Sequence, residues 1–206
     1  MLLRGERIRA LVVGGGAVSA RKVAALLESG ARARVVAPEL AVSLRDLAGA
    51  APERLQLVER AYETSDVADA NLVIAATGDR VVNARVARDA DALGRLVNVA
   101  DAAEREGSWT SLATHRAGAL VVSVSAGGVP GVARRVRDAI ADRFDARYAT
   151  AVERLAALRA ETLARRGAGA WRSAAAELTG PSFCEEVESG VLFGRLERRS
   201  REDAWR

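Results

Sequence analysis

The chain has 206 residues, of which 50% are hydrophobic and 28% are charged, and its formal net charge is +4. This balance is typical of a soluble globular protein and excludes both a wholly disordered chain and a low-complexity fibre. The single cysteine excludes an intrachain disulfide and favours a cytoplasmic protein, while the single histidine excludes a site built from several histidines. The sequence shows neither a signal peptide nor roughly 18 consecutive apolar residues, so we expect no membrane association.

Short apolar runs alternate with helical patterns through the first hundred residues. The runs predict strands at 8–13, 31–37, 55–58, 71–76 and 96–99, and the patterns between them predict helices at 17–29, 40–48 and 81–93. Strands that alternate with helices indicate a parallel sheet with helices on both faces. The runs are apolar at consecutive positions, which indicates strands buried on both sides. The expected fold class is therefore α/β, with a Rossmann-like parallel sheet.

The pattern changes after residue 101. Residues 109–113 and 119–125 predict two further strands, with the only histidine, His115, between them, and a break rich in glycine and proline follows at 127–131. Apolar residues at 132, 136, 140 and 144 then recur every four positions, which indicates one face of a helix. A second helix, a break at 167–169, a third helix at 171–178 and a helical tail at 181–196 complete the chain. We expect a nucleotide-binding domain followed by a helical part.

A glycine-rich loop joins the first predicted strand to the first predicted helix. Its residues are Gly14, Gly15, Gly16, Ala17, Val18 and Ser19. The first glycine permits a tight turn, the third lets the backbone approach a pyrophosphate, and a small residue at position 19 allows close packing of helix and strand. The free N–H groups of the helix N-terminus favour phosphate binding. The loop predicts a dinucleotide site; the alternative is a tight turn that binds nothing.

The choice between NAD and NADP depends on the residues around the second strand. An acidic residue after this strand is the usual partner of the adenosine ribose, and the candidate is Glu39. An arginine there would favour a 2′-phosphate, and Arg32 and Arg34 are nearby in the sequence. Alternation along the strand puts both arginines on one face, where they are solvated or paired. We therefore favour NAD.

Several motifs together resemble one family. They are GGGAVSARK (14–22), VVAPE (35–39), IAATGD (74–79), Val82-Asn83, NVAD (98–101) and VSVSAGG (122–128), the last followed by a basic helix. Their order and spacing over about residues 1–150 resemble precorrin-2 dehydrogenase, the dehydrogenase–ferrochelatase module of siroheme synthase. The resemblance departs at Ala126, where the family usually has Ser or Thr, and at Pro130, which follows the glycine pair one position early.

The resemblance implies an organisation and an activity. It implies an NAD-binding Rossmann domain at 1–112, a dimerisation region at 113–148 and a helical domain at 149–206, assembled as a homodimer. The implied reaction is the oxidation of precorrin-2 to sirohydrochlorin by NAD. In bifunctional members ferrous iron is then inserted to give siroheme; the sequence leaves open whether this chain does so.

The resemblance also implies site residues. Those expected beside NAD are Gly14, Gly15, Gly16, Ala17, Val18, Pro38, Glu39, Ala75, Ala76 and Thr77. Those expected to contact the tetrapyrrole are Asn98, Ser125, Gly127 and Gly128. Arg135, with Arg134 and Arg137, follows the glycine turn and suits the substrate's carboxylates; the alternative is a solvated basic face of a dimer helix. The family's key carboxylate falls on Asp101, which follows the fifth strand. A carboxylate there can accept the proton lost on dehydrogenation and can hold an entering metal ion transiently; the alternative is that Asp101 caps a helix at 102–105.

The sequence leaves other functions open. A Rossmann module that senses NAD without catalysis would not need a base at Asp101. A nucleic-acid-binding protein would show a basic stripe and a recognition motif, whereas the arginines here are dispersed and aromatic residues make up only 4% of the chain. A lone histidine makes a poor iron site, so we expect His115 to be a surface or packing residue. We expect Cys184 to be a small apolar residue.

Overall fold

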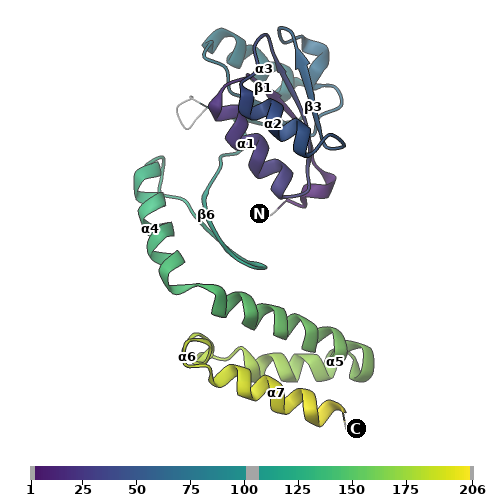
Figure 1. Ribbon diagram of the computed structural model, residues 1–206, viewed down its shortest axis with the longest axis vertical. Helices are drawn as coiled ribbons and strands as arrows, with labels where there is room; N and C mark the ends of the chain where they lie inside the picture. The colour runs from purple at the N-terminus through teal and green to yellow at the C-terminus, as the bar shows by residue number, and fades with distance from the viewer. Residues whose placement is uncertain (1–2, 101–106, 205–206) are drawn as a thin grey trace. The chain divides into compact units, whose positions relative to one another are not determined.

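The computed structural model describes residues 3–100 and 107–204, the last four of these by their backbone alone. Asp101, the expected catalytic carboxylate, lies outside the described residues. The chain divides into two compact units, Met1–Ser111 and Leu112–Arg206. The first unit is built on a parallel sheet, and the second is a β-hairpin followed by helices (Figure 1).

Five parallel strands form the sheet of the first unit, in the order β3-β2-β1-β4-β5. Their bounds are β1 Arg9–Val13, β2 Arg32–Ala37, β3 Leu55–Glu59, β4 Leu72–Ala75 and β5 Leu96–Val99. All four residues of β4 are buried, as are the last four of β1. This burial explains the consecutive apolar residues, because a central parallel strand contacts helices on both of its faces. The predicted α/β class and its Rossmann-like sheet are confirmed.

Helices cover both faces of this sheet. Helices α1 (Ala17–Glu28) and α2 (Val42–Ala50) pack on one face, where Val23 and Leu44 are buried against Val12. Helix α3 (Arg80–Ala92) packs on the other face, where Val86 is buried against Leu11. Two short 3-10 helices, η1 (Gly5–Arg7) and η2 (Thr64–Val67), precede β1 and follow β3.

The ends of these elements follow from single residues. Strand β2 stops directly before Pro38, which has no N–H to donate to a neighbouring strand. Gly30 follows α1 with a φ of 86°, a left-handed conformation that glycine adopts without steric cost. Helix α3 begins at the side chain of Asp79, which accepts hydrogen bonds from the N–H groups of Val81 and Val82.

The second unit begins with an antiparallel hairpin. Strands β6 (Ala113–Ala117) and β7 (Leu120–Val124) are joined by a two-residue turn at Gly118, whose φ is 58°. Four helices follow: α4 Pro130–Arg143, α5 Ala146–Leu178, α6 Phe183–Ser189 and α7 Val191–Ala204. Tyr148 of α5, Val187 of α6 and Leu192 of α7 are buried in one cluster, so these helices share a core.

Helix α5 contains the predicted break near residue 167. Gly167 has φ 78° and ψ 179°, a backbone conformation open to almost no residue but glycine. The helix reverses its direction there, so that its two arms lie side by side (Figure 1). Leu158 of the first arm and Leu178 of the second are buried in the same cluster.

Two predictions for the second unit were wrong in detail. The strand expected at 109–113 lies at Ala113–Ala117, so His115 is inside β6 and not between two strands. The turn at Gly118 fixes this register, because it pairs Ala117 with Leu120 and hence Ala113 with Val124. The expected single helical tail is two helices, separated by Gly190 with a φ of 82°.

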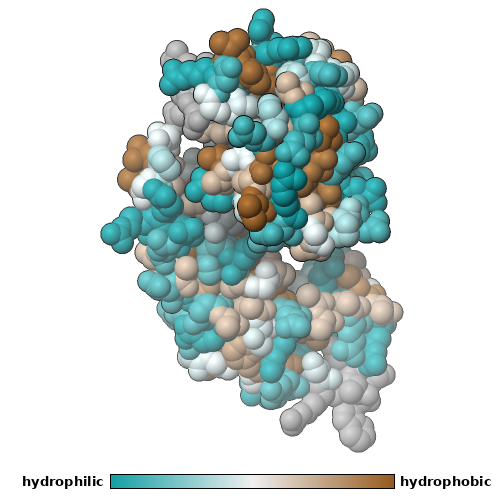
Figure 2. Space-filling model, turned by 45° about the horizontal axis from the view of Figure 1, so that its top comes forward, coloured by the Kyte–Doolittle hydropathy of each residue, from teal (hydrophilic) through white to brown (hydrophobic). Residues whose placement is uncertain are grey.

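The surface mixes polar and apolar side chains. Figure 2 shows hydrophilic side chains over much of the visible face, with small hydrophobic patches between them. Three valines are exposed at α4, namely the N-cap residue Val129 and, within the helix, Val132 and Val136, with exposed fractions of 53%, 51% and 43%. Their spacing puts them on one side of the helix, where they form an apolar face that the described residues leave exposed. Among the described residues, no helix combines the length and the apolar character that crossing a bilayer requires.

Candidate dinucleotide-binding site

The glycine loop lies where the sheet changes its direction of winding. Helix α1 leads from β1 to β2 on one side, whereas the chain later crosses to β4 on the other side of β1. Ligands of open α/β sheets bind at the carboxyl ends of the strands at such a point. Gly14 directly follows the last residue of β1, so the loop occupies this position.

The three glycines of this loop have different roles. Gly14 has a φ of 125°, and a Cβ atom on it would overlap the carbonyl oxygen of Ala76. A Cβ atom on Gly15 would overlap the carbonyl oxygen of Glu39. At Gly16, by contrast, a Cβ atom would meet no heavy atom within 4 Å. The fold therefore requires Gly14 and Gly15, while the space beside Gly16 is open to a ligand.

The N-terminus of α1 points into this space without a capping side chain. Gly16 is the N-cap residue, and the first turn of α1 contains no acidic residue. The first N–H groups of a helix lack partners within the helix and carry the positive end of its dipole, so they favour an anion. Ser19 is fully buried, in agreement with the expected close packing of helix and strand. The loop thus fits a pyrophosphate, as the sequence predicts.

The residues after β2 form one wall of the site. The N–H of Ala41 donates a hydrogen bond of 2.9 Å to the carbonyl oxygen of Gly15, which holds this segment against the glycine loop. Glu39 lies in this segment, two residues before Ala41, and it is exposed. Pro38 and Glu39 therefore lie beside the loop, at the end of the sheet where the adenosine ribose of a dinucleotide is expected.

The two arginines of β2 lie away from this wall. Arg32 is the first residue of the strand, and a rise of about 3.3 Å per residue puts it roughly 16 Å from the last residue, Ala37. The guanidinium of Arg34 donates a hydrogen bond of 2.6 Å to the carbonyl oxygen of Asp66 and lies 3.6 Å from its carboxylate. Arg34 is thus paired, which was one of the two expected alternatives.

The segment after β4 forms the opposite wall. The N–H of Ala76 donates to the carbonyl oxygen of Val13, and the hydroxyl of Thr77 donates to Asn83 over 2.7 Å. Asn83 is only 4% exposed and also bonds both backbone groups of Thr77. Ala75 is fully buried, so its methyl group packs in the core and does not face the crevice. The sequence motifs that resemble the family include Asn83, but they assign it no role in shaping this wall.

A lysine and an asparagine meet beyond this wall, near the end of β5. The ammonium of Lys22 donates hydrogen bonds to the amide oxygen of Asn98 at 2.8 Å and to the hydroxyl of Ser111 at 3.2 Å. The ammonium also lies 5.8 Å from the centre of the Trp109 ring. The backbone oxygen of Trp109 accepts a hydrogen bond from the amide nitrogen of Asn98. Burial, with a smaller contribution from Arg21, lowers the pKa of Lys22 below its ordinary value.

The remaining expected site residues lie in the turn before α4 and in α4 itself. Ser125, Gly127, Gly128 and Arg135 belong to the second unit, where the first three lie in the turn between β7 and α4. Gly127 and Gly128 have φ values of 50° and 80°, so this turn requires glycine at both positions. The first unit brings together the glycine loop and the segments after β2 and β4.

Comparisons with known proteins agree with this geometry. Residues 1–108 match the model of the family NAD_binding_7, described as "Putative NAD(P)-binding". The chain is 43% identical to a siroheme synthase of Ectopseudomonas mendocina over 139 residues, which are 67% of this chain and 29% of that protein. It is 40% identical to a siroheme synthase of Chromobacterium violaceum over 150 residues, or 72% of this chain and 31% of that protein. The chain thus spans about three tenths of the length of these relatives.

A solved structure has the same fold. The structure titled SirC, precorrin-2 dehydrogenase, matches with a TM-score of 0.76 over 96% of this chain and 98% of that one. The two sequences are 22% identical. The match extends through both units, so the helical part belongs to the shared fold together with the sheet.

Proposed function

The chain belongs to the NAD(P)-binding family that its first 108 residues match, and from this premise we propose that it oxidises precorrin-2 to sirohydrochlorin with NAD. One observation carries the proposal above all. An uncapped helix N-terminus, with open space beside Gly16, lies in a chain that is 43% identical to a siroheme synthase over 139 residues. The structural match to a protein titled precorrin-2 dehydrogenase agrees with it.

NAD, rather than NADP, is the proposed cofactor. Glu39 is exposed and belongs to the wall after β2, which lies against the glycine loop. Its carboxylate suits a ribose hydroxyl and repels a 2′-phosphate. Arg32 and Arg34, the arginines that the sequence put nearby, lie toward the opposite end of β2.

The proposed roles of this chain's residues follow from the chemistry of dehydrogenation. NAD, when bound, accepts the hydride that precorrin-2 loses. Asp101 accepts the accompanying proton. Asn98, Ser125, Gly127 and Gly128 contact the tetrapyrrole, and Arg135 pairs with its carboxylates, because a guanidinium binds a carboxylate through two parallel hydrogen bonds.

Insertion of ferrous iron is a second candidate activity, favoured by the name of the relatives, siroheme synthase. Ferrous iron would be a substrate, and Asp101 would accept pyrrole protons as the metal enters. Ala126 lies beside the glycine pair in place of the family's usual hydroxyl residue, which would affect metal insertion more than oxidation.

The proposed assembly is a cytoplasmic homodimer. Residues 1–112 would form the dinucleotide domain, 113–148 the dimerisation region and 149–206 the helical domain. The exposed valines of α4 support this division, because an apolar helix face of this kind is favourable at an interface between two copies. The single cysteine is consistent with a reducing compartment.

Anaerobic conversion of precorrin-2 tests the function. The purified protein is incubated with precorrin-2 and NAD, with and without ferrous or cobaltous ion, and the absorption spectrum is followed. We expect NAD-dependent formation of sirohydrochlorin. The variant Asp101→Asn should bind NAD normally but should form no sirohydrochlorin. A second spectral change that requires metal would establish chelation. Intact NAD binding without any oxidation would instead favour an NAD-sensing module and overturn the enzyme proposal.

A further inference from the structure

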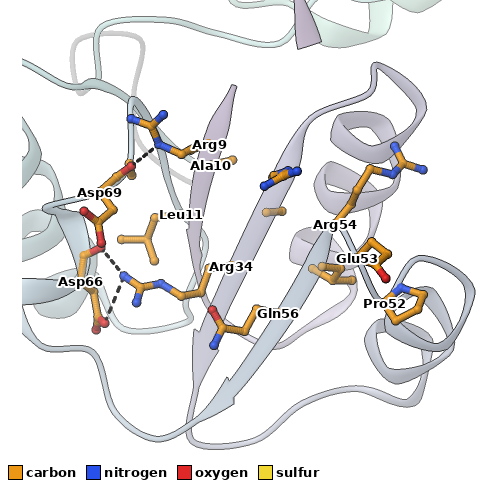
Figure 3. A pocket seen from close by; sticks show the side chains of 14 residues that line it. Arg9, Ala10, Leu11, Arg34, Pro52, Glu53, Arg54, Gln56, Asp66 and Asp69 are labelled. Carbon is orange, nitrogen blue, oxygen red and sulfur yellow. Dashed lines mark hydrogen bonds and ion pairs between the residues drawn. The ribbon is translucent and has the colours of Figure 1, made fainter. Parts of the chain in front are cut away.

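A cavity of about 290 Å³ opens at the amino ends of β1, β2 and β3 (Figure 3). Arginines surround it: Arg9, Arg32, Arg34 and Arg54. The glycine loop follows the carboxyl end of β1, whereas the cavity lies at the amino ends of the strands. The cavity and the candidate dinucleotide site are therefore at opposite ends of the strands. The chain between β3 and β4 forms only the short helix η2, and α3 packs near β4 and β5, which leaves this part of the sheet open.

The sheet register puts three of these arginines on one face. Arg9 of β1 is the direct neighbour of Arg32 of β2. Arg34, two residues further along β2, points to the same side, where Gln56 of β3 is its neighbour. Like charges directly opposite each other on a sheet face destabilise the pairing. The cluster therefore costs stability unless an anion lies between the guanidinium groups.

The bonds of these arginines orient the guanidinium groups but leave much of their charge uncompensated. Arg9 donates through Nε to the carbonyl oxygen of Asp69 at 2.9 Å, and Arg54 donates to the carbonyl oxygen of Leu27 at 2.7 Å. Arg34 likewise donates to a backbone oxygen, that of Asp66 (Figure 3). A guanidinium has five N–H donors, so each retains donors for a ligand.

The carboxylates at the cavity do not replace such an anion. The side chain of Asp66 is 2% exposed, and both of its oxygens accept hydrogen bonds from Arg60, at 2.7 and 2.8 Å. Its contact with Arg34 is longer, at 3.6 Å. Glu53 and Asp69 also line the cavity, but within residues 3–100 and 107–204 neither carboxylate forms an ion pair with its arginines.

We propose that this cavity binds a small polyvalent oxyanion, a di- or tricarboxylate or a pyrophosphate, at a site separate from the dinucleotide crevice. Guanidinium groups pair with carboxylates and phosphates through two parallel hydrogen bonds. Several of them around one cavity favour an anion with more than one charged group. The volume is close to the lower limit of about 300 Å³ for small-molecule sites, so the ligand is small.

Citrate and pyrophosphate are the two probes, titrated by calorimetry at low ionic strength with saturating NAD present. NAD blocks the glycine loop, which could itself bind pyrophosphate. The test variant is Arg32→Gln, because the side chain of Arg32 makes no hydrogen bond or ion pair within the described part of the chain. The matched control is Arg88→Gln, an exposed arginine of α3 whose side chain, among the described residues, bonds only the carbonyl oxygen of Ala84 in its own helix. Comparison of the two probes identifies the preferred oxyanion.

We expect one site per chain, with affinity about tenfold lower in Arg32→Gln and unchanged in Arg88→Gln, because one charge-assisted bond is lost. Without anion, Arg32→Gln should unfold at a higher urea concentration than the wild type, since one like-charge neighbour is removed. The proposal is overturned if neither probe binds, if NAD displaces the probe, or if both variants bind like the wild type. None of these outcomes depends on activity toward precorrin-2.

Discussion

Lys22 and Asn98 are 76 positions apart in the chain, yet the ammonium of one donates a 2.8 Å hydrogen bond to the amide oxygen of the other. Lys22 is the only lysine among 31 basic residues, all others being arginine. The compact ammonium contacts Asn98, Ser111 and the ring of Trp109, and a planar guanidinium has a different shape and donor geometry. The contact fixes the amide of Asn98, so that its oxygen accepts from Lys22 and its nitrogen donates to Trp109.

Lys22→Met should lower the free energy of unfolding by about 1–2 kcal/mol, because the nearly buried amide oxygen of Asn98 loses its donor. Lys22→Arg should recover little of this loss. Urea unfolding measures the effect, with Glu28→Gln, an exposed residue of the same helix, as the control. Equal stability of Lys22→Arg and the wild type would show that the positive charge at position 22 stabilises the fold whatever the shape of the side chain.

The glycine loop allows substitutions that separate folding from binding. Gly14→Ala should destabilise the protein by more than about 2 kcal/mol, because its φ is positive and its Cβ would overlap Ala76. Gly16→Ala should leave stability nearly unchanged but weaken NAD binding roughly tenfold or more, because a methyl group would take the place of a phosphate contact. Thermal unfolding and NAD titration, performed on both variants, measure the two effects. Normal NAD affinity in Gly16→Ala would mean that the phosphates bind elsewhere.

Glu39 should set the preference for NAD over NADP. Glu39→Ser removes the carboxylate that repels a 2′-phosphate, so the ratio of the two affinities should shift toward NADP by about tenfold, the size of one charge interaction. Glu28→Ser, at the far end of α1, is the control because it is also exposed. The dissociation constants of both dinucleotides are measured for each variant. An unchanged ratio would exclude Glu39 from the ribose site.

The pH dependence of stability should report Asp66. Hydrogen bonds from Arg60, and then the N–H of Glu63, hold the pKa of this carboxyl below its ordinary value. A carboxyl with a lowered folded pKa stabilises the fold above its unfolded pKa of about 4 and loses this contribution as the pH falls through the folded value. Asp66→Asn should therefore be less stable at pH 7 and should lose less stability between pH 5 and pH 2.

Urea unfolding across this pH range compares Asp66→Asn with Asp91→Asn, an exposed carboxyl of α3. The control should keep the acid sensitivity of the wild type. The same acid sensitivity in Asp66→Asn would show that other carboxyl groups dominate the acid transition.

The exposed valines of α4 test the proposed dimer. Val132→Glu puts a charge on the apolar face, so the variant should sediment as a monomer at concentrations where the wild type is a dimer. Val191→Glu is the matched control, because Val191 is 53% exposed on α7. If Val132→Glu remained a dimer, the dimer interface would have to lie on another surface.

Much of the first unit could be predicted from sequence because its signals are local. The apolar runs of β1 and β4 and the glycines after β1 lie within a few residues of what they determine. The contact between Lys22 and Asn98 has no local signature, because the two residues are 76 positions apart in the chain. The first strand of the hairpin is predicted too early because the apolar spacing around Trp109 resembles a strand. Trp109 instead belongs to the first unit and packs against its core, and Gly118 fixes the register of the hairpin.

The reversal at Gly167 has a consequence for how this protein changes in evolution. The two arms of α5 lie against each other, so an insertion in one arm alone would rotate its apolar residues away from the common core. Length changes should therefore survive only as whole helical turns, and in pairs, one on each side of residue 167. Among homologues we expect the span between the hairpin and α6 to vary in such matched steps, with a glycine kept at the reversal.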